Sequence, residues 1–132
     1  MNDIAATIGI ENFKHLNSIV KKHRDNADFY DKELKDVDKV TLLERKYNHK
    51  SSFWIYSMFV EHKDEFMNHM KECGIMVSQV HERNDIHSCV KEFETHLPTL
   101  DRITPKLISI PVGWWVTKKD RQYIVDCIKK GW

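Results

Sequence analysis

The stretch from Gly74 to His87, GIMVSQVHERNDIH, joins an apolar run to polar side chains that could bind a ligand. The run from Ile75 to Val80 is rich in apolar and β-branched residues, and it predicts a strand. The side chains around its end can carry charge or form hydrogen bonds: His81, Glu82, Arg83, Asn84, Asp85 and His87. Strand ends that open into polar loops often form sites in α/β domains, because the sheet fixes the backbone while the loop presents side chains. We therefore expect a ligand to meet the protein here.

Four of these residues are the candidate substrate-binding residues: His81, Arg83, Asn84 and His87. Arginine suits bidentate contact with a phosphate group, and histidine and asparagine can donate hydrogen bonds to phosphate or hydroxyl oxygens. The alternative is a solvated polar loop that binds nothing. The residue pattern alone does not choose between the two.

A metal site is a third possibility for this stretch. The possible ligands are Cys73, His81, His87 and Cys89, of which only His87 and Cys89 lie close together in the sequence. Zinc sites are built from tight ligand pairs, so we expect no metal here. Cys127 makes the number of cysteines odd, and no CxxC spacing occurs, which predicts reduced thiols.

Length and charge exclude several classes of protein. The chain has 132 residues, enough for one domain with a single core. Its 21 Lys and Arg residues nearly balance its 20 Asp and Glu residues, so we expect no nucleic-acid partner. The basic stretch Lys14–Arg24 is followed by acidic residues, which favours a solvated helix. No run approaches the roughly 20 apolar residues of a membrane span, and no signal sequence is recognisable. We expect a soluble, cytoplasmic protein.

A long helix should support the site from the N-terminal side. Residues from Asp3 to about Asp36 contain no proline, and their apolar positions recur at helical intervals. Such a helix would be about 50 Å long, which exceeds the roughly 36 Å diameter of a compact domain of this length. We expect its N-terminal end to overhang, because the apolar residues between Ile4 and Ile10 spread around most of the circumference. Gly9 in this run suggests close approach of a packing partner that is absent from the chain.

The middle of the chain predicts a small sheet with one helix. Val40–Leu43 reads as a short strand and Arg45–Ser51 as a loop. Ser52–Val60, dense in aromatic and β-branched residues, predicts a central strand. Lys63–Cys73 predicts a helix with Gly74 as its C-cap. With the strand that begins at Ile75, these elements form a split βαβ unit.

The C-terminal third predicts one more strand and a terminal helix. Val90–Phe93 should form a helical turn, and Leu97–Pro105 should be mostly irregular because it holds two prolines. Leu107–Val112 predicts a strand at a sheet edge or ending near Pro111. Thr117 and Asp120 stand at the capping-box interval before a helix with an apolar stripe of Tyr123, Ile124, Cys127 and Ile128, closed by Gly131. For Trp114 and Trp115, core or interface packing is favoured over ligand stacking.

Three stretches make the chain similar to a known family. They are MNDIAATIGIENFKHL at residues 1–16, GIMVSQVHERNDIH at 74–87 and SIPVGWWVTKKDRQYIVDCI at 109–128. In this order and spacing they resemble the C-terminal part of the DegT-type sugar aminotransferases, which are pyridoxal-phosphate enzymes of fold type I. The second stretch departs from the commoner form, in which Tyr-Pro-Pro-x-His follows the strand. This departure bears on sugar specificity.

The resemblance implies a mixed α/β (α+β) fold: the small C-terminal domain over residues 1–132, with residues 1–36 as a long interdomain helix. It implies a nucleotide-linked keto-sugar as substrate and pyridoxal phosphate as cofactor of the complete enzyme. The large domain with the Schiff-base lysine would be missing, so we expect no catalytic residue, no bound cofactor and no activity in this chain alone. Self-association or homodimerisation through the N-terminal helix would follow. The alternative is a free-standing binding or oligomerisation module derived from that domain.

Overall fold

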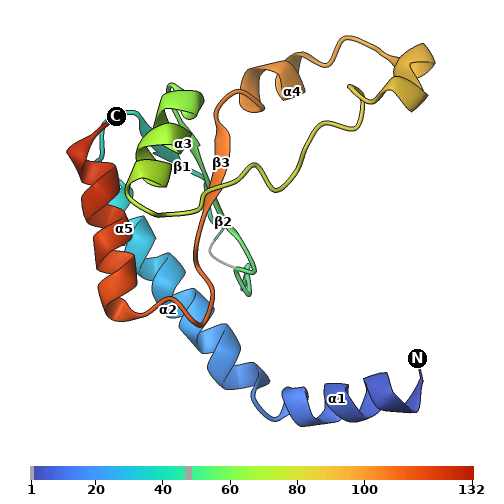
Figure 1. Cartoon of the computed structure of the whole chain (residues 1–132), viewed down its shortest axis with the longest axis vertical. Helices are drawn as coiled ribbons and strands as arrows, with labels where there is room; N and C mark the ends of the chain where they lie inside the picture. The colour runs from blue at the N-terminus through green and yellow to red at the C-terminus, as the bar shows by residue number, and fades with distance from the viewer. Residues whose placement is uncertain (1, 47–48) are drawn as a thin grey trace.

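The computed structural model describes residues 2–46 and 49–132, and within them it shows five α-helices, one 3-10 helix and three strands (Figure 1). The elements in chain order are α1 (Asp3–Phe13), α2 (Leu16–Leu34), β1 (Val40–Leu42), β2 (Tyr56–Val60), α3 (Lys63–Glu72), η1 (Ser88–Phe93), α4 (Pro98–Ile103), β3 (Leu107–Ile110) and α5 (Lys118–Lys130). This confirms the predicted mixed α/β fold with a small sheet and flanking helices. Among the described helices, none combines the length and apolar character that a membrane span requires.

The sheet has the order β1-β2-β3, with both neighbouring pairs antiparallel, and the prediction of a central strand is confirmed by β2. Met58 of β2 pairs with Leu42 on one side and Ile108 on the other. The predicted strand from Ile75 to Val80 is wrong, because a single antiparallel bridge between Ser78 and Ser109 replaces it. The bridge makes this segment run parallel to β2 with β3 between them. The split arrangement is therefore present with its last strand reduced to one residue pair.

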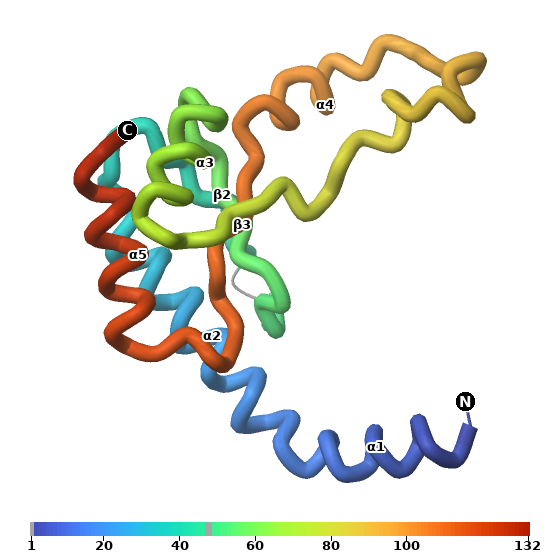
Figure 2. Tube along the Cα trace, viewed as in Figure 1, coloured from blue at the N-terminus to red at the C-terminus, as the bar shows by residue number. Residues whose placement is uncertain are grey.

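The predicted single long helix is wrong, because it breaks at Lys14 and His15 into α1 and α2. The amide groups of these two residues donate to carbonyl oxygens three positions back, at 3.3 and 3.0 Å, which tightens the last turn of α1. A new helix then starts at His15, whose carbonyl oxygen accepts from the amide of Ile19. No residue of α1 is buried, so no packing surface holds the two segments in line. Figure 2 shows α1 turning away from α2.

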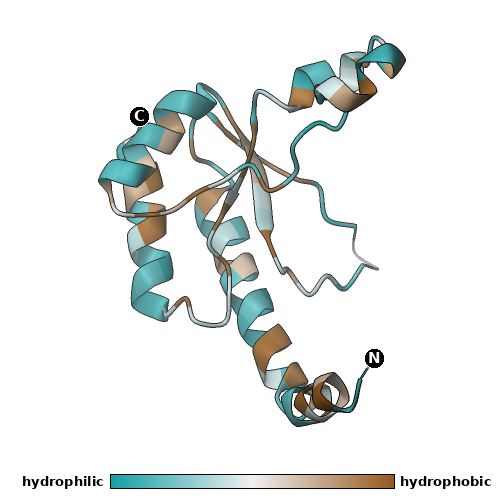
Figure 3. Ribbon diagram, turned by 45° about the vertical axis from the view of Figure 1, so that its right-hand side comes forward, coloured by the Kyte–Doolittle hydropathy of each residue, from teal (hydrophilic) through white to brown (hydrophobic). Residues whose placement is uncertain are grey.

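The N-terminal overhang is confirmed. Ile4 is 73% exposed, Ile8 57% and Ile10 65%, and nothing lies within 4 Å of the position that a Cβ of Gly9 would take. Figure 3 shows apolar residues on α1, apart from the rest of the molecule. An apolar helix that is exposed on this scale is a candidate interaction surface.

The core lies between the sheet and the helices α2, α3 and α5. Ala27, Tyr30 and Leu34 of α2 are fully buried. The Tyr30 ring meets the Tyr56 ring edge-on at 5.1 Å between centroids, and its hydroxyl donates to the Pro111 carbonyl oxygen at 2.8 Å. The other fully buried large side chains are Phe66, Met58, Met70, Ile108, Ile128, Val60, Val125 and Cys127.

Residues 80–106, here called the arm, extend away from the rest of the molecule (Figures 1 and 2). The predicted helical turn is confirmed as η1, whereas the prediction that Leu97–Pro105 is mostly irregular is wrong because α4 lies there. Pro98 occupies the first turn of α4, where its missing N–H costs no helical hydrogen bond. The prolines therefore delimit a short helix instead of preventing one.

The predicted capping box is confirmed at the start of α5. The Thr117 hydroxyl accepts from the amide of Asp120 at 3.2 Å, and the Asp120 carboxylate accepts from the amide of Thr117 at 2.9 Å. Hydrogen bonding of the Asp120 carboxylate to the backbone and the side chain of Thr117 lowers the pKa of Asp120. In the predicted stripe, Ile124, Cys127 and Ile128 are buried, together with Val125, whereas Tyr123 is half exposed.

Core or interface packing was expected for Trp114 and Trp115; within the described residues core packing does not hold, and interface packing stays a prediction. Trp114 is 49% exposed and Trp115 64%. The Trp115 ring occupies the space beside Gly113, where a Cβ would lie only 2.4 Å from ring atoms. A glycine is required there, because any side chain would displace the ring.

Asn26 holds the segment that links β3 to α5 against α2. Its buried amide nitrogen donates to the carbonyl oxygens of Val112, Gly113 and Val116 at 3.3, 3.1 and 3.2 Å. Its amide oxygen accepts from Arg121 at 3.1 Å. One side chain thus satisfies backbone groups that the sheet and the helix leave without partners.

Asn26→Leu is expected to lower the free energy of unfolding by about 1 to 3 kcal/mol, because buried carbonyl oxygens lose their donors. Denaturant unfolding of the purified chain measures this loss. Asp25→Ala serves as the control, since Asp25 pairs with Lys21 on the exposed face of α2 and should change the stability by less than about 1 kcal/mol. Equal effects of the two substitutions would contradict the role of Asn26.

Candidate functional site

Lys63, in the first turn of α3, fixes the start of the candidate loop. Its ammonium group donates to the Gln79 side-chain oxygen at 2.7 Å and to the Thr104 carbonyl oxygen at 2.8 Å. The side-chain amide nitrogen of Gln79 donates in turn to the His81 carbonyl oxygen at 3.3 Å. One cation therefore joins α3, the segment before His81 and the end of α4.

Arg83 ties the candidate loop to α4. Its Nε donates to Asp85 at 2.9 Å, and its two terminal nitrogens form ion pairs with Asp85 and with Asp101 of α4. The side chains of Arg83 and Asp85 are each 17% exposed. Hydrogen bonding to Arg83 lowers the pKa of Asp85, and the two carboxylates raise the pKa of Arg83. The guanidinium is thus engaged by two carboxylates within the chain.

A pocket of about 480 Å³ lies between the candidate loop and α4. Its apolar wall consists of Leu97, Leu100, Ile103 and Leu107. Its polar rim consists of Gln79, His81, Glu82, Arg83, Asn84, Asp85 and Thr104. The structure therefore brings three of the four candidate residues, His81, Arg83 and Asn84, to one pocket.

His87 does not line this pocket. It stands exposed at the start of η1, where its carbonyl oxygen accepts from the amide of Val90 at 3.0 Å. Its own amide donates to the Asn84 carbonyl oxygen at 3.5 Å. The four candidate residues thus belong to one short stretch of backbone, with His87 at its outer end.

Trp54 is a site residue that the sequence did not indicate. Its ring meets the His81 ring edge-on at 6.0 Å between centroids, and the side chain is 67% exposed. In β2 the buried positions alternate, at Tyr56, Met58 and Val60, and the same alternation would predict a buried Trp54. The chain bends before β2 begins, so no period in the sequence could have placed this ring at the surface.

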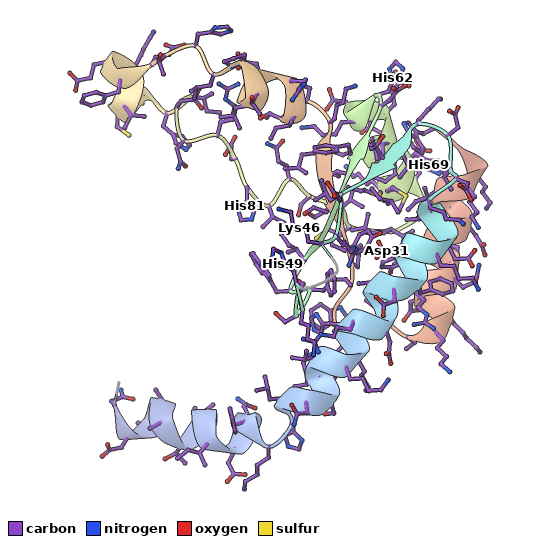
Figure 4. All side chains as sticks on the ribbon, turned by 180° about the vertical axis from the view of Figure 1, so that it is seen from behind. Asp31, Lys46, His49, His62, His69 and His81 are labelled. Atoms are coloured by element: carbon purple, nitrogen blue, oxygen red, sulfur yellow. The ribbon has the colours of Figure 1, made fainter. Side chains whose placement is uncertain are left out.

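The β1–β2 loop, described over residues 43–46 and 49–55, is anchored beside the core by Asp31. The Asp31 carboxylate accepts from the Tyr56 hydroxyl at 2.8 Å and pairs with Arg45 at 2.8 Å. Burial raises the pKa of Asp31 and outweighs the lowering by Tyr56 and Arg45. Figure 4 shows Lys46, His49 and His81 on one side of the molecule. The predicted loop Arg45–Ser51 is free of helix and strand wherever it is described, and residues 47 and 48 fall outside the described part.

Metal ligation finds no support in this part of the chain: over residues 2–46 and 49–132, no group of three or more His, Cys, Asp and Glu side chains is placed to hold an ion. Cys73 contacts His69 instead, with 3.9 Å between Sγ and Nε2. Hydrogen bonding to Cys127 raises the pKa of the Cys73 thiol.

Acidification is expected to break the ion pair between Arg83 and Asp85 within the candidate loop. Because Arg83 depresses the pKa of Asp85 below its ordinary 3.8, the pair is fully formed above that value and is lost as the pH falls through the lower, folded-state pKa. The NMR signal of the Arg83 Nε–H group, followed as the pH falls below about 4, reports this loss. In Asp85→Asn the signal should already be shifted near neutral pH; an unshifted signal there would contradict the pairing.

Comparison with known proteins shows that one family model matches almost the whole chain. Residues 1–129 match the model of the DegT/DnrJ/EryC1/StrS aminotransferase family. The chain is 28% identical over 136 aligned positions to the UDP-4-amino-4,6-dideoxy-N-acetyl-beta-L-altrosamine transaminase of Campylobacter jejuni, and the match covers 97% of this chain and 36% of that protein.

Two crystal structures are similar over the full length of the chain. AtS13 from Actinomadura melliaura is 42% identical with a TM-score of 0.98, and the match covers 100% of this chain and 35% of that one. The sugar aminotransferase CalS13 from Micromonospora echinospora is also 42% identical, with a TM-score of 0.97 and coverage of 100% and 36%. The chain therefore spans about a third of the length of these relatives.

Proposed function

Because the chain belongs to the DegT/DnrJ/EryC1/StrS aminotransferase family, we propose that it is the small C-terminal domain of a pyridoxal-phosphate-dependent aminotransferase acting on a nucleotide-linked keto-sugar. One observation carries the proposal: the full chain superposes on a third of a sugar aminotransferase at 42% identity. The whole reaction needs groups from the other two thirds, so this chain alone is inactive.

The residues present do not fit the cofactor. Pyridoxal phosphate requires a free lysine amine in a pocket and a cradle of backbone donors for its phosphate. Lys63 is partly buried, but its amine is held by Gln79 and Thr104. The four glycines are isolated from one another and form no phosphate-binding loop. We therefore assign no step through the cofactor to this chain and place that chemistry in the other two thirds of the complete enzyme.

The proposed task of this chain is to bind the nucleotide sugar. His81 and Asn84 at the pocket, and His87 beyond it, present donors to phosphate or hydroxyl oxygens. Arg83 is proposed to contribute in two ways. Its ion pairs with Asp85 and Asp101 shape the loop, and contact with a phosphate would require exchange of one carboxylate for the ligand.

A chimera tests the function directly. The C-terminal third of CalS13 is replaced by residues 1–132, and transfer of an amino group to a nucleotide-linked keto-sugar is measured. We expect an active chimera, whereas the isolated chain mixed with pyridoxal phosphate should show neither activity nor the visible absorption of lysine-bound cofactor. A folded chimera that binds the cofactor and fails on every keto-sugar offered would contradict the proposal, and so would activity of the isolated chain.

The exposed α1 favours a second candidate function. Its apolar side chains would serve a free-standing oligomerisation module as well as a domain that packs on a partner. An active chimera favours the enzyme, because a module that has lost the enzyme's function need not keep a competent substrate loop.

A further inference from the structure

The residue before Trp54 adopts a backbone conformation that residues other than glycine rarely take. Phe53 has a φ of 51°, in the left-handed region. Its amide donates to the Ser51 hydroxyl at 3.1 Å, and its carbonyl oxygen accepts from His23 Nδ1 at 2.7 Å. The Arg45 guanidinium lies over its ring at 4.2 Å from the centroid. Backbone strain that is held by several contacts clusters at functional sites.

This conformation has a definite result: it presents Trp54 to solvent beside the candidate loop. Trp54 would be an inward residue if the strand continued, yet it is 67% exposed. Its edge-on contact with His81, at 6.0 Å, leaves most of the indole surface open. The chain therefore holds a strained residue in place, and the outcome is an aromatic surface at the site.

The charge around this surface selects the kind of ligand. The β1–β2 loop carries Lys46, His49 and Lys50, all exposed. Lys46 and His49 lie on the same side of the molecule as His81 (Figure 4). An aromatic ring on the same loop as exposed cations matches a ligand that combines a flat base with phosphate groups, because bases stack on aromatic side chains and ammonium groups attract phosphates.

We propose that Trp54 and His81 form the platform for the base of a nucleoside diphosphate, with its phosphates near the cations of the β1–β2 loop. This rests on the proposed function, since the base and the diphosphate are the nucleotide part of the substrate. It adds a base-stacking residue, Trp54, and assigns His23, Ser51 and Arg45 as positioning residues that hold Phe53.

Titration of the isotope-labelled chain with UDP or dTDP tests the platform by NMR. We expect the Trp54 indole and His81 ring signals to shift, and Trp54→Ala to weaken binding about 5- to 150-fold while Trp54→Phe retains most of it. Phe93→Ala is the control, because Phe93 is an aromatic residue of η1 that is 72% exposed and lies outside the platform; the affinity of this variant should equal that of the wild type. Inorganic pyrophosphate should bind more weakly and leave the Trp54 signal unmoved.

The inference would be overturned by unchanged affinity in Trp54→Ala, by pyrophosphate binding as tight as that of UDP and dTDP, or by no binding of either nucleotide. A Trp54 signal that moves with protein concentration instead of nucleotide would also overturn it, since a protein surface would then cover the ring. These failures differ from failure of the proposed function, because an active chimera whose KM is insensitive to Trp54→Ala loses only the platform.

Discussion

Replacing His87 by alanine in the chimera is expected to raise the KM for the nucleotide sugar about 10- to 150-fold, with the absorption of the bound cofactor unchanged. A charge-assisted hydrogen bond to phosphate contributes about 1.5 to 3 kcal/mol, which corresponds to that range. His87 stands exposed at the outer end of the candidate loop, where it can meet the nucleotide without rearrangement of the chain. Steady-state kinetics at varied sugar concentration give the KM.

His96→Ala is the control, because His96 lies on the same arm and its side chain is 81% exposed. Arg83→Ala should raise the KM by a similar factor, but it should also shift the backbone signals of α4 in the isolated chain, since the ion pair with Asp101 is lost. His87→Ala should leave those signals in place. If the sugar kinetics are unchanged in both variants, the assignment of the loop to the substrate is wrong.

The largest effect on assembly is expected from α1. We propose that the isolated chain self-associates through residues 4–10, because residues 2–46 and 49–132 leave their apolar side chains exposed. Burial of one isoleucine side chain contributes about 1.5 to 3 kcal/mol, so the three isoleucines of this segment can stabilise a dimer strongly. The associated form should be a dimer, since two-fold pairing is the commonest assembly. Ile4→Glu combined with Ile8→Glu should convert this form into a monomer, as measured by sedimentation.

Asn12→Glu is the matched control, since it adds a charge to the same helix without removing an apolar side chain. It should leave the association intact. Hydrogen exchange of residues 4–10 distinguishes the remaining outcomes. A wild-type monomer with rapidly exchanging amides would mean that α1 frays instead of pairing, and a monomer with strongly protected amides would show that α1 is covered from within the chain.

The sequence predicted elements whose stabilising contacts are local. The capping box of Thr117 and Asp120 and the central strand β2 are confirmed, because each depends on neighbouring residues or on a dense apolar run. The predicted C-cap at Gly74 is off by one residue: Cys73 is the C-cap of α3, and Gly74 follows it in the left-handed region with a φ of 72°. The break at His15 was missed because no proline or glycine marks it. Helical periodicity continues on both sides of the break, and only the absence of packing against α1 lets the chain turn.

The candidate site was predictable only in part. The polar cluster after Val80 predicted a loop, and three of the four candidate substrate-binding residues in it line one pocket. The ion pair between Arg83 and Asp101 could not be predicted, because it depends on α4. The two prolines in this segment had predicted irregular structure instead of a helix. The same limit applies to Trp54. Its exposure follows from the dihedral angle of Phe53, which tertiary contacts impose.

The packing of α2 against α5 has a consequence for the folding of the chain. Arg121 of α5 donates to the carbonyl oxygen of Asp25 of α2, 96 positions earlier, and to the side-chain oxygen of Asn26, 95 positions earlier. Contacts between such distant segments form only after the intervening chain has closed a large loop, which costs entropy before any contact compensates. We therefore expect the rate of folding to be limited by this closure, so that substitutions at the α2–α5 contact alter refolding rates more than equally destabilising ones within the β1–β2 hairpin.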